Sequence, residues 1–333
     1  MKKVLVIGSS GAMGRYLVPE LADMGYAVTA VSLDKEAPCR TNVTCRQGNA
    51  KDKAFLTALL SEGFDGIVDF MVYPHPEFAE YMPLFLEHTD HYIFLSSCRV
   101  YDDKEQPIKE TSPRLLDASD DEALKQSNDY CIYKALAENM LTRSSYTNWT
   151  VVRPATTFST MRYQLVTLEA ADNVGRALKG KKVLLPIQAK DKPATLSWAG
   201  DVAKMIARIL FKKEALRETY NVCSAEYRTW EEIAAYYKDL VGLETVWIDK
   251  EDYLAILDPD MKTSTRWQLE YARLFHRITD NSKVLALTGL QQSDLMPMYE
   301  GLKKEIAAIP AGFTFPETPV GQRMDAYLAK HGL

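Results

Sequence analysis

The first fourteen residues constrain the fold of this chain more than any other stretch. Residues 3–7 form a short apolar run rich in branched side chains, which indicates a buried strand. A turn with three glycines follows, Gly8-Ser-Ser-Gly11-Ala-Met-Gly14, and a helical pattern begins near Tyr16. A strand, a glycine turn and a helix in this order are typical of the opening of a dinucleotide-binding domain.

Each glycine of this turn has a separate role in such a domain. Gly8 permits the tight turn, Gly11 lets the main chain approach a pyrophosphate, and Gly14 lets the helix pack on the strand. The start of the helix offers N–H groups and the positive end of its dipole to the phosphates. The turn residues that we expect to bind the cofactor are Gly8, Ser10, Gly11, Ala12, Met13 and Gly14.

A second informative stretch lies further along the chain. Tyr130 and Lys134 stand four residues apart in a run that reads as helix through Met140, and side chains at that spacing share one face of a helix. The pKa of a phenol lies near ~10, and an ammonium group beside it lowers that pKa. The pair can therefore exchange a proton during redox chemistry at a carbon that bears a hydroxyl. Read alone, the spacing also fits a packed ring beside a surface lysine.

The glycine spacing, Gly-x-x-Gly-x-x-Gly, resembles the short-chain dehydrogenases/reductases, and the chain length resembles their extended branch, the NAD-dependent epimerase/dehydratase family. The resemblance covers most of the chain and includes Ser97 and Arg153-Pro154, which occur in the family's order. It implies an α/β Rossmann fold, a doubly wound parallel sheet with a smaller, interleaved C-terminal lobe. It also implies NAD as the cofactor.

The resemblance assigns roles to individual residues. Ser97 would orient the substrate oxygen, Tyr130 would exchange its proton, and Lys134 would assist the phenol and hold the cofactor ribose. The further residues that it places against the cofactor are Ser32, Asp34, Asn49, Ala50, Met71, Val72 and Pro154.

The end of the second predicted strand, residues 27–32, bears on the choice between NAD and NADP. An acidic residue there binds the ribose hydroxyls of NAD, whereas a basic residue accommodates the 2′-phosphate of NADP. Ser32 stands at the family's usual acid position, and Leu33, Asp34 and Lys35 follow. Asp34 favours NAD and Lys35 leaves NADP open; we expect NAD.

The domain organisation can be outlined from the same pattern. We expect a dinucleotide-binding domain over residues 1–160, to which residues 194–225 return, and a substrate lobe over 161–193 and 226–333. Within the second half, residues 163–178 predict a helix, and Asp201 is expected to cap another one. Thr229 and Glu232 have the spacing of a capping box, which predicts a helix start.

Composition narrows the classes of partner. The formal net charge of −5 argues against a nucleic-acid surface, because phosphate binding needs a basic footprint. No apolar run has the length of a membrane span. The five scattered cysteines lack metal-ligand spacing and fit reduced thiols in a cytoplasmic protein. We expect a cytoplasmic enzyme with a small-molecule substrate, for which the resemblance suggests a nucleotide sugar; a homodimer is left open.

Three functions remain open at this point. The first is an epimerase-like oxidoreductase; a dehydratase of this family uses an Asp-Glu pair after the catalytic serine, and Cys98-Arg99 stands there instead. The second is a simple NAD(P)-dependent reductase or dehydrogenase that releases its product after one hydride transfer. The third is a non-catalytic, dinucleotide-sensing or RNA-associated protein, against which the complete Ser-Tyr-Lys set argues.

Overall fold

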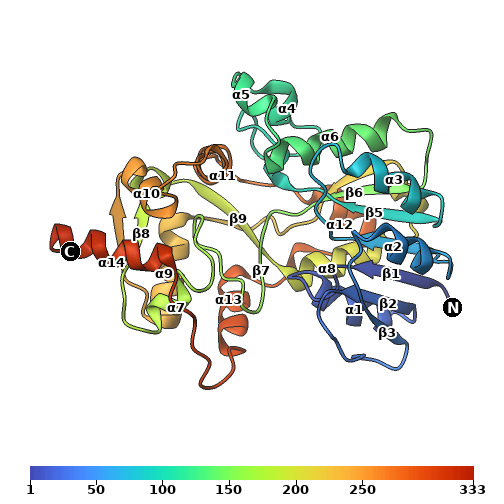
Figure 1. The fold of residues 1–333 in the computed structure, drawn as a ribbon, viewed down its shortest axis with the longest axis horizontal. Helices are drawn as coiled ribbons and strands as arrows, with labels where there is room; N and C mark the ends of the chain where they lie inside the picture. The colour runs from blue at the N-terminus through green and yellow to red at the C-terminus, as the bar shows by residue number, and fades with distance from the viewer. The chain divides into compact units, whose positions relative to one another are not determined.

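The computed structural model describes residues 1–333 and divides into two compact units (Figure 1). Unit 1 comprises Met1–Ala155, Ala199–Ser224 and Thr279–Leu295, and unit 2 comprises Thr156–Trp198, Ala225–Ile278 and Met296–Leu333. Residues 279–295, which the sequence pattern assigns to the substrate lobe, group with unit 1. The reason is apolar packing, since Val284 and Leu295 share a buried cluster with the central sheet of unit 1.

A seven-stranded parallel sheet forms the centre of unit 1, in the order β3-β2-β1-β4-β5-β6-β10. This order confirms the predicted doubly wound fold. The strands are β1 (Lys3–Ile7), β2 (Ala27–Ser32), β3 (Val43–Gln47), β4 (Gly66–Asp69), β5 (His91–Leu95), β6 (Trp149–Arg153) and β10 (Glu218–Asn221).

Helices cover both faces of this sheet, which is why its central strands are almost entirely apolar. One buried cluster joins the sheet to α1 (Gly14–Asp23), α8 (Ala199–Ile209) and α12 (Ser282–Thr288). A second cluster joins it to α2 (Lys53–Leu60), α3 (Phe78–Leu86) and α6 (Tyr130–Arg143). A short 3-10 helix, η1 (Cys98–Val100), follows β5, and the long loop before α6 contains α4 (Leu115–Ala118) and α5 (Glu122–Lys125).

The carboxyl ends of the seven strands meet along one edge of the sheet, because all the strands run in the same direction. The strand order reverses between β1 and β4. In open α/β sheets, ligands bind at that edge and at that reversal. A ligand is therefore expected beside the residues that follow β1, β4, β5 and β6.

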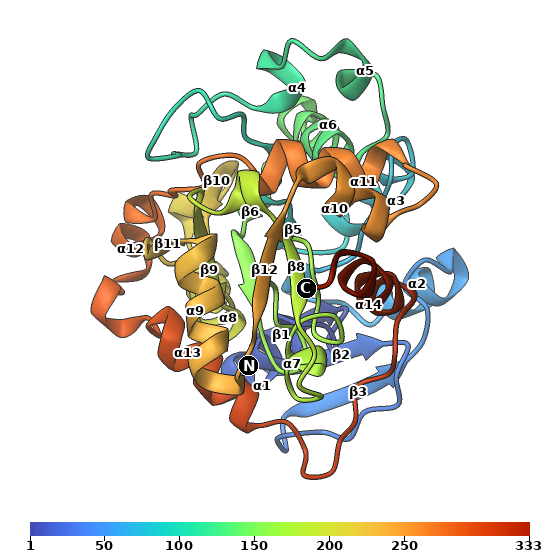
Figure 2. The same cartoon turned by 90° about the vertical axis from the view of Figure 1, so that its left-hand side faces the viewer.

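Unit 2 has its own apolar core, which includes the buried rings of Trp230, Tyr237 and Tyr253. It contains a three-stranded sheet in the order β11-β9-β7 and a parallel pair, β12 and β8, visible in Figure 2. The strands are β7 (Thr156–Phe158), β8 (Val183–Pro186), β9 (Pro193–Trp198), β11 (Tyr227–Thr229) and β12 (Thr245–Ile248). The helices are α7 (Val174–Ala177), α9 (Trp230–Val241), α10 (Lys250–Leu257), α11 (Thr263–Gln268), α13 (Met298–Ala307) and α14 (Pro319–His331).

Two local predictions in the second half are wrong and one is confirmed. Residues 163–178 form mainly turns, with Val166 at a φ of 53°, and only the four residues of α7 are helical. Asp201 is the third residue of α8 rather than its N-cap residue, and its Oδ1 accepts a hydrogen bond from Lys204 Nζ at 3.2 Å. The capping box is present, because Thr229 and Glu232 satisfy each other's main-chain N–H groups.

Candidate active site

The glycine turn after β1 is a cradle of main-chain atoms. Gly8 has a φ of +82°, and the N–H groups of Gly8 and Ser9 donate to Val31 O at 2.9 and 3.0 Å, which holds the turn against β2. A Cβ on Gly14 would lie 2.5 Å from Gly8 O, so α1 can approach the strand only because Gly14 has no side chain. Gly11 is exposed.

The cradle fits a dinucleotide pyrophosphate. A side chain on Gly11 would extend into open space beside the turn, since its Cβ would meet only Gly8 O, at 3.2 Å. No side chain caps the first turn of α1, which leaves main-chain N–H groups available to an anion. The main chain of the turn and the start of α1 would therefore hold the phosphates of NAD.

Helix α6 carries Tyr130 and Lys134 and begins at a well-defined cap. Asp129 is the N-cap, and its Oδ1 accepts a hydrogen bond from Cys131 N at 3.1 Å. Tyr130 is the first residue of the helix and is partly exposed, whereas Lys134, one turn further, is buried. The Lys134 Nζ lies 5.8 Å from the centroid of the Tyr130 ring.

Lys134 reaches the carboxyl edge of the sheet from α6. Its Nζ donates to Leu95 O at 2.6 Å, at the end of β5, and to Met71 O at 3.4 Å, just after β4. Burial lowers the pKa of Lys134 to about 8, although the charges of Asp69 and Glu138 oppose that shift. Because an ammonium has three protons, these two bonds leave one N–H for a cofactor ribose.

Ser97 occupies the turn between β5 and η1. Its Oγ accepts a hydrogen bond from Arg99 N at 3.1 Å, and the Arg99 guanidinium lies 5.3 Å from the centroid of the Tyr130 ring. Arg99 thus connects the serine and the tyrosine of the predicted set. The next residue, Cys98, donates its N–H to Pro154 O at 2.9 Å, so the loop after β6 meets the loop after β5.

A buried ionic network lies behind these residues. Glu138, one turn after Lys134 on α6, accepts hydrogen bonds from Arg153 Nε at 2.8 Å, from Arg114 Nη1 at 3.0 Å and from Ser96 Oγ at 2.5 Å. Burial alone would raise the pKa of Glu138, but Arg153, Ser96 and Arg114 together hold it below its usual value. The Ser96 hydroxyl therefore belongs to this network, whereas the Ser97 hydroxyl does not contact Glu138.

The loop after β2 presents a carboxylate that the sequence pattern did not single out. Ser9 Oγ in the glycine turn donates to Glu36 Oε2 at 2.6 Å. Ser32 Oγ donates to Asp34 O at 2.9 Å and accepts from Asp34 N at 3.1 Å, so the side chain of Ser32 stabilises its own turn. Asp34 itself is exposed. Glu36 is thus the acidic residue in contact with the cradle, and the path of the loop, rather than its spacing, brings it there.

The remaining predicted residues also follow strand ends. Asn49 is exposed beyond β3, and its Oδ1 accepts from Lys51 N at 3.0 Å, while Ala50 is buried beside it. Met71 and Val72 follow β4, and Val72 is exposed. Contacts of these residues with the cofactor stay predictions.

Asp69 is a further buried acid at this edge. It ends β4, and its carboxylate accepts from Met71 N at 2.9 Å and from the Tyr92 hydroxyl at 2.8 Å. Burial raises the pKa of Asp69, against these two hydrogen bonds and the charge of Lys134. In the sequence, Asp69 stands out because it is the one acidic residue of an otherwise apolar strand.

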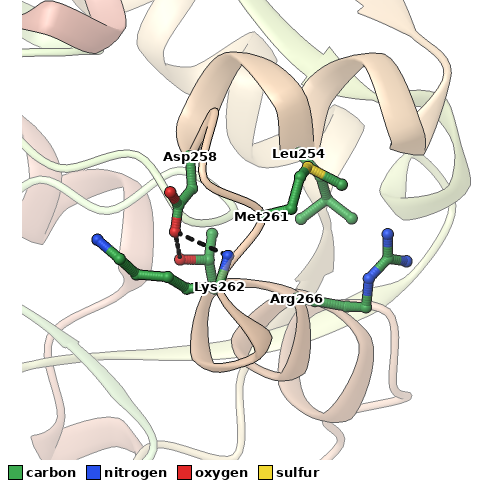
Figure 3. A pocket seen from close by; sticks show the side chains of 6 residues that line it. Leu254, Asp258, Met261, Lys262 and Arg266 are labelled. Atoms are coloured by element: carbon green, nitrogen blue, oxygen red, sulfur yellow. Dashed lines mark hydrogen bonds between the residues drawn. The ribbon is translucent and has the colours of Figure 1, made fainter.

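A hollow in unit 2 has no comparable chemistry. It lies beside α10 and α11 and is lined by Leu254, Asp258, Met261, Lys262, Thr265 and Arg266 (Figure 3). Asp258 Oδ2 already accepts hydrogen bonds from Thr265 Oγ1 at 2.9 Å and from Lys262 N at 3.3 Å. Its carboxylate is therefore occupied by the local turn.

The parallel sheet and the glycine turn at its carboxyl edge place the chain among the dinucleotide-dependent enzymes with a Rossmann fold. Comparison with protein-family models narrows this class. The model of the NAD dependent epimerase/dehydratase family matches residues 4–223, and the chain belongs to this family. It is accordingly an enzyme of the extended short-chain dehydrogenase/reductase type, and its cofactor is NAD.

Solved structures share this fold at low sequence identity. Epimerase Mth375 from Methanothermobacter thermautotrophicus is 16% identical over 99% of this chain and 93% of its own, with a TM-score of 0.68. A UDP-glucose 4-epimerase from Thermotoga maritima, solved with UDP-glucose, is 17% identical over 92% of this chain and 97% of its own, with a TM-score of 0.65. A dTDP-glucose 4,6-dehydratase from Bacillus anthracis, solved with NAD, is 16% identical over 92% and 96%, with the same TM-score of 0.65.

No curated protein matches the sequence. None of the helices combines the length and the apolar character that crossing a membrane requires.

Proposed function

We propose that this enzyme oxidises a secondary alcohol of a nucleotide sugar and then returns the hydride to the opposite face of the same carbon, as an epimerase does. One observation carries the proposal: Ser97, Tyr130 and Lys134 gather at the carboxyl edge of the sheet that also bears the glycine cradle. When bound, NAD supplies a hydride acceptor there that can give the hydride back. The UDP-glucose bound by a structural relative supports the substrate class.

The three side chains have separate roles in the proton transfer. Ser97 holds the substrate oxygen with its hydroxyl. Tyr130 takes the hydroxyl proton of the substrate as the hydride leaves the carbon, and gives that proton back when the hydride returns. Lys134 stabilises the phenolate through its charge and holds the cofactor ribose.

Two neighbouring residues argue against dehydration. The family's dehydratases use an acid and a base in the two positions after the serine, where this chain has Cys98 and Arg99. The Cys98 thiol is buried and donates to Arg153 O at 3.3 Å. Arg99 is a cation and cannot act as a base near neutral pH. The elimination step therefore lacks its proton carriers.

A panel of nucleotide sugars, deuterated at the carbon to be oxidised, tests the proposal. The purified protein is incubated with each sugar and NAD, and the products are identified by NMR and mass spectrometry. An epimerase yields both epimers with the deuterium retained and no net reduction of the cofactor. Net reduced cofactor with a keto product would instead identify a simple dehydrogenase, and the Tyr130→Phe variant serves as the control.

A further inference from the structure

Arg99 is held against the active-site tyrosine by a short, well-ordered turn. It lies in η1, directly after Ser97, whose Oγ accepts the Arg99 main-chain N–H at 3.1 Å. The guanidinium donates through Nη2 to Asp129 Oδ1 at 3.1 Å, and Asp129 is the cap of α6. The side chain of Arg99 is 16% exposed and that of Asp129 is 3% exposed. Arg99 therefore approaches Tyr130 from the β5 side of the site.

The guanidinium uses few of its hydrogen-bond donors. Arginine has five N–H groups, and a structural ion pair commonly uses two of them in a bidentate contact. Here the bond to Asp129 is the single side-chain hydrogen bond of Arg99, and the buried Nε has no hydrogen-bond partner. The group is instead placed over the Tyr130 ring, with 5.3 Å between Cζ and the ring centroid.

Tyr130 thus has two cations beside its ring, and they differ in how they respond to pH. Lys134 Nζ is 5.8 Å from the ring centroid, and burial lowers the pKa of Lys134 to about 8. A guanidinium, by contrast, keeps its charge over the whole working range of an enzyme. Two other titratable groups lie nearby. The carboxylate of the preceding residue, Asp129, pairs with Arg99, and the Tyr133 ring is edge-on to Tyr130, with 5.4 Å between the ring centroids. Burial raises the pKa of Tyr133, so this phenol is neutral.

We propose that Arg99 is a positioning residue for Tyr130: its guanidinium lies over the ring, and its charge adds to that of Lys134 in stabilising the phenolate. This inference rests on the proposed role of Tyr130 as the proton carrier. The proposal also explains a difference from the family's dehydratases. Where they have the second acidic residue after the catalytic serine, this chain has Arg99, whose positive charge acts on Tyr130.

Ionisation of Tyr130 can be measured without any substrate. Tyrosine labelled at Cζ is incorporated into the protein, the Tyr130 signal is assigned by its loss in Tyr130→Phe, and its midpoint is followed by NMR as the pH is raised. An opposite charge at this distance shifts a midpoint by about 1 to 3 pH units, so we expect Arg99→Gln to raise it by about one unit. Arg99→Lys, which keeps the charge, should restore most of the shift.

Two further variants isolate the charge of Arg99. Arg143→Gln removes the same charge from the exposed end of α6 and should leave the midpoint unchanged. Asp129→Asn keeps a good helix cap but removes the neighbouring anion, so it should lower the midpoint. Because Asp129→Asn should shift the midpoint in the direction opposite to Arg99→Gln, it tests the proposal even if Arg99→Gln folds poorly.

The proposal is overturned by an Arg99→Gln protein of normal thermal stability whose Tyr130 titrates as in the original protein. It is also overturned if that variant raises KM alone and leaves the pH profile of kcat unmoved, because Arg99 would then bind substrate. Failure of the proposed function has another signature: Tyr130→Phe would transfer hydride at the normal rate, whatever the titration shows.

Discussion

The two halves of the proposed site are built in opposite ways. The proposed cofactor cradle, Gly8–Gly14, is made of main chain, and its shape depends on Gly14, which has no side chain to keep α1 from the strand. The proton-transfer half is made of side chains, many of them buried and charged, from segments as distant as Asp69, Ser97, Tyr130 and Arg153. A short contiguous stretch is thus enough to form the first half, whereas only the assembled sheet can form the second.

Tyr130→Phe tests the side-chain half with the largest expected effect. The change removes the hydroxyl and leaves ring packing nearly intact. Turnover should fall by about 10² to 10⁴, the usual contribution of a positioned proton carrier, while NAD affinity stays close to normal. Single-turnover hydride transfer and thermal unfolding on the same sample check this result. A variant with lost thermal stability but normal turnover per folded molecule would reduce Tyr130 to a packing residue.

A pair of glycine variants tests the main-chain half. A Cβ on Gly14 would lie 2.5 Å from Gly8 O and 2.6 Å from Ser9 O, so Gly14→Ala should destabilise the fold by about 1 to 3 kcal/mol. Gly11→Val should leave the unfolding temperature nearly unchanged but abolish NAD binding, since its side chain would occupy the path of the pyrophosphate. Calorimetric titration and thermal unfolding separate the two outcomes. Normal NAD affinity in Gly11→Val would refute the assignment of the cradle.

Lys134→Met should affect both halves, because we propose that Lys134 holds the ribose and also stabilises the phenolate. In the original protein the charge of Lys134 disappears as the pH rises through about 8; in the variant it is absent at every pH. Phenolate then forms only at higher pH, and the onset of activity should move upward by about one pH unit or more, together with weaker NAD binding. An unchanged onset in the pH–rate profile, with Lys134→Arg as the charge-retaining control, would contradict this role.

Glu36→Gln should have the smallest effect, and it tests whether Glu36 or Asp34 belongs to the cofactor site. We expect Glu36, rather than Asp34, to accept hydrogen bonds from the adenosine ribose hydroxyls, which is the role of an acid near the end of β2 in such domains. Loss of a hydrogen bond that involves a charged group costs about 1.5 to 3 kcal/mol, so NAD affinity should fall roughly tenfold or more and the preference over NADP should shrink. Asp34→Asn removes the same charge from the same loop and is the matched control. Should Asp34→Asn weaken NAD binding while Glu36→Gln does not, the sequence-based expectation for Asp34 would stand and the assignment to Glu36 would fall.

The cradle and the central sheet could be predicted because their signals are local. Residues 3–14 contain a strand, a turn and a helix start in one stretch, and the apolar runs mark most of the other strands. The ionic part of the site could not be predicted in this way. Glu138 appears as an ordinary polar residue of a helix until the fold brings Arg114 and Arg153 to it. Glu36 reaches Ser9 only because of the path of the loop after β2, and residue spacing does not specify that path.

The errors in the second half have a physical cause as well. Apolar residues between 163 and 178 recur as they would on a helix face, and Leu165, Val166 and Leu168 are indeed buried. They are buried by a tight turn, however, because tertiary packing holds Val166 at a positive φ that local preference disfavours. Periodicity thus identified the core residues of this segment and misidentified its backbone.

The buried network behind the site also determines the torsional stiffness of α6. Tyr130, Lys134 and Glu138 follow one another at intervals of four residues along one face of the helix. Glu138 forms a buried ion pair with Arg153, and Lys134 donates hydrogen bonds to two main-chain carbonyls at the strand ends. Rotation of the helix about its axis would break the buried ion pair, at a cost of about 3 to 5 kcal/mol. The main chain of Tyr130 is therefore held by a rigid support before any substrate arrives.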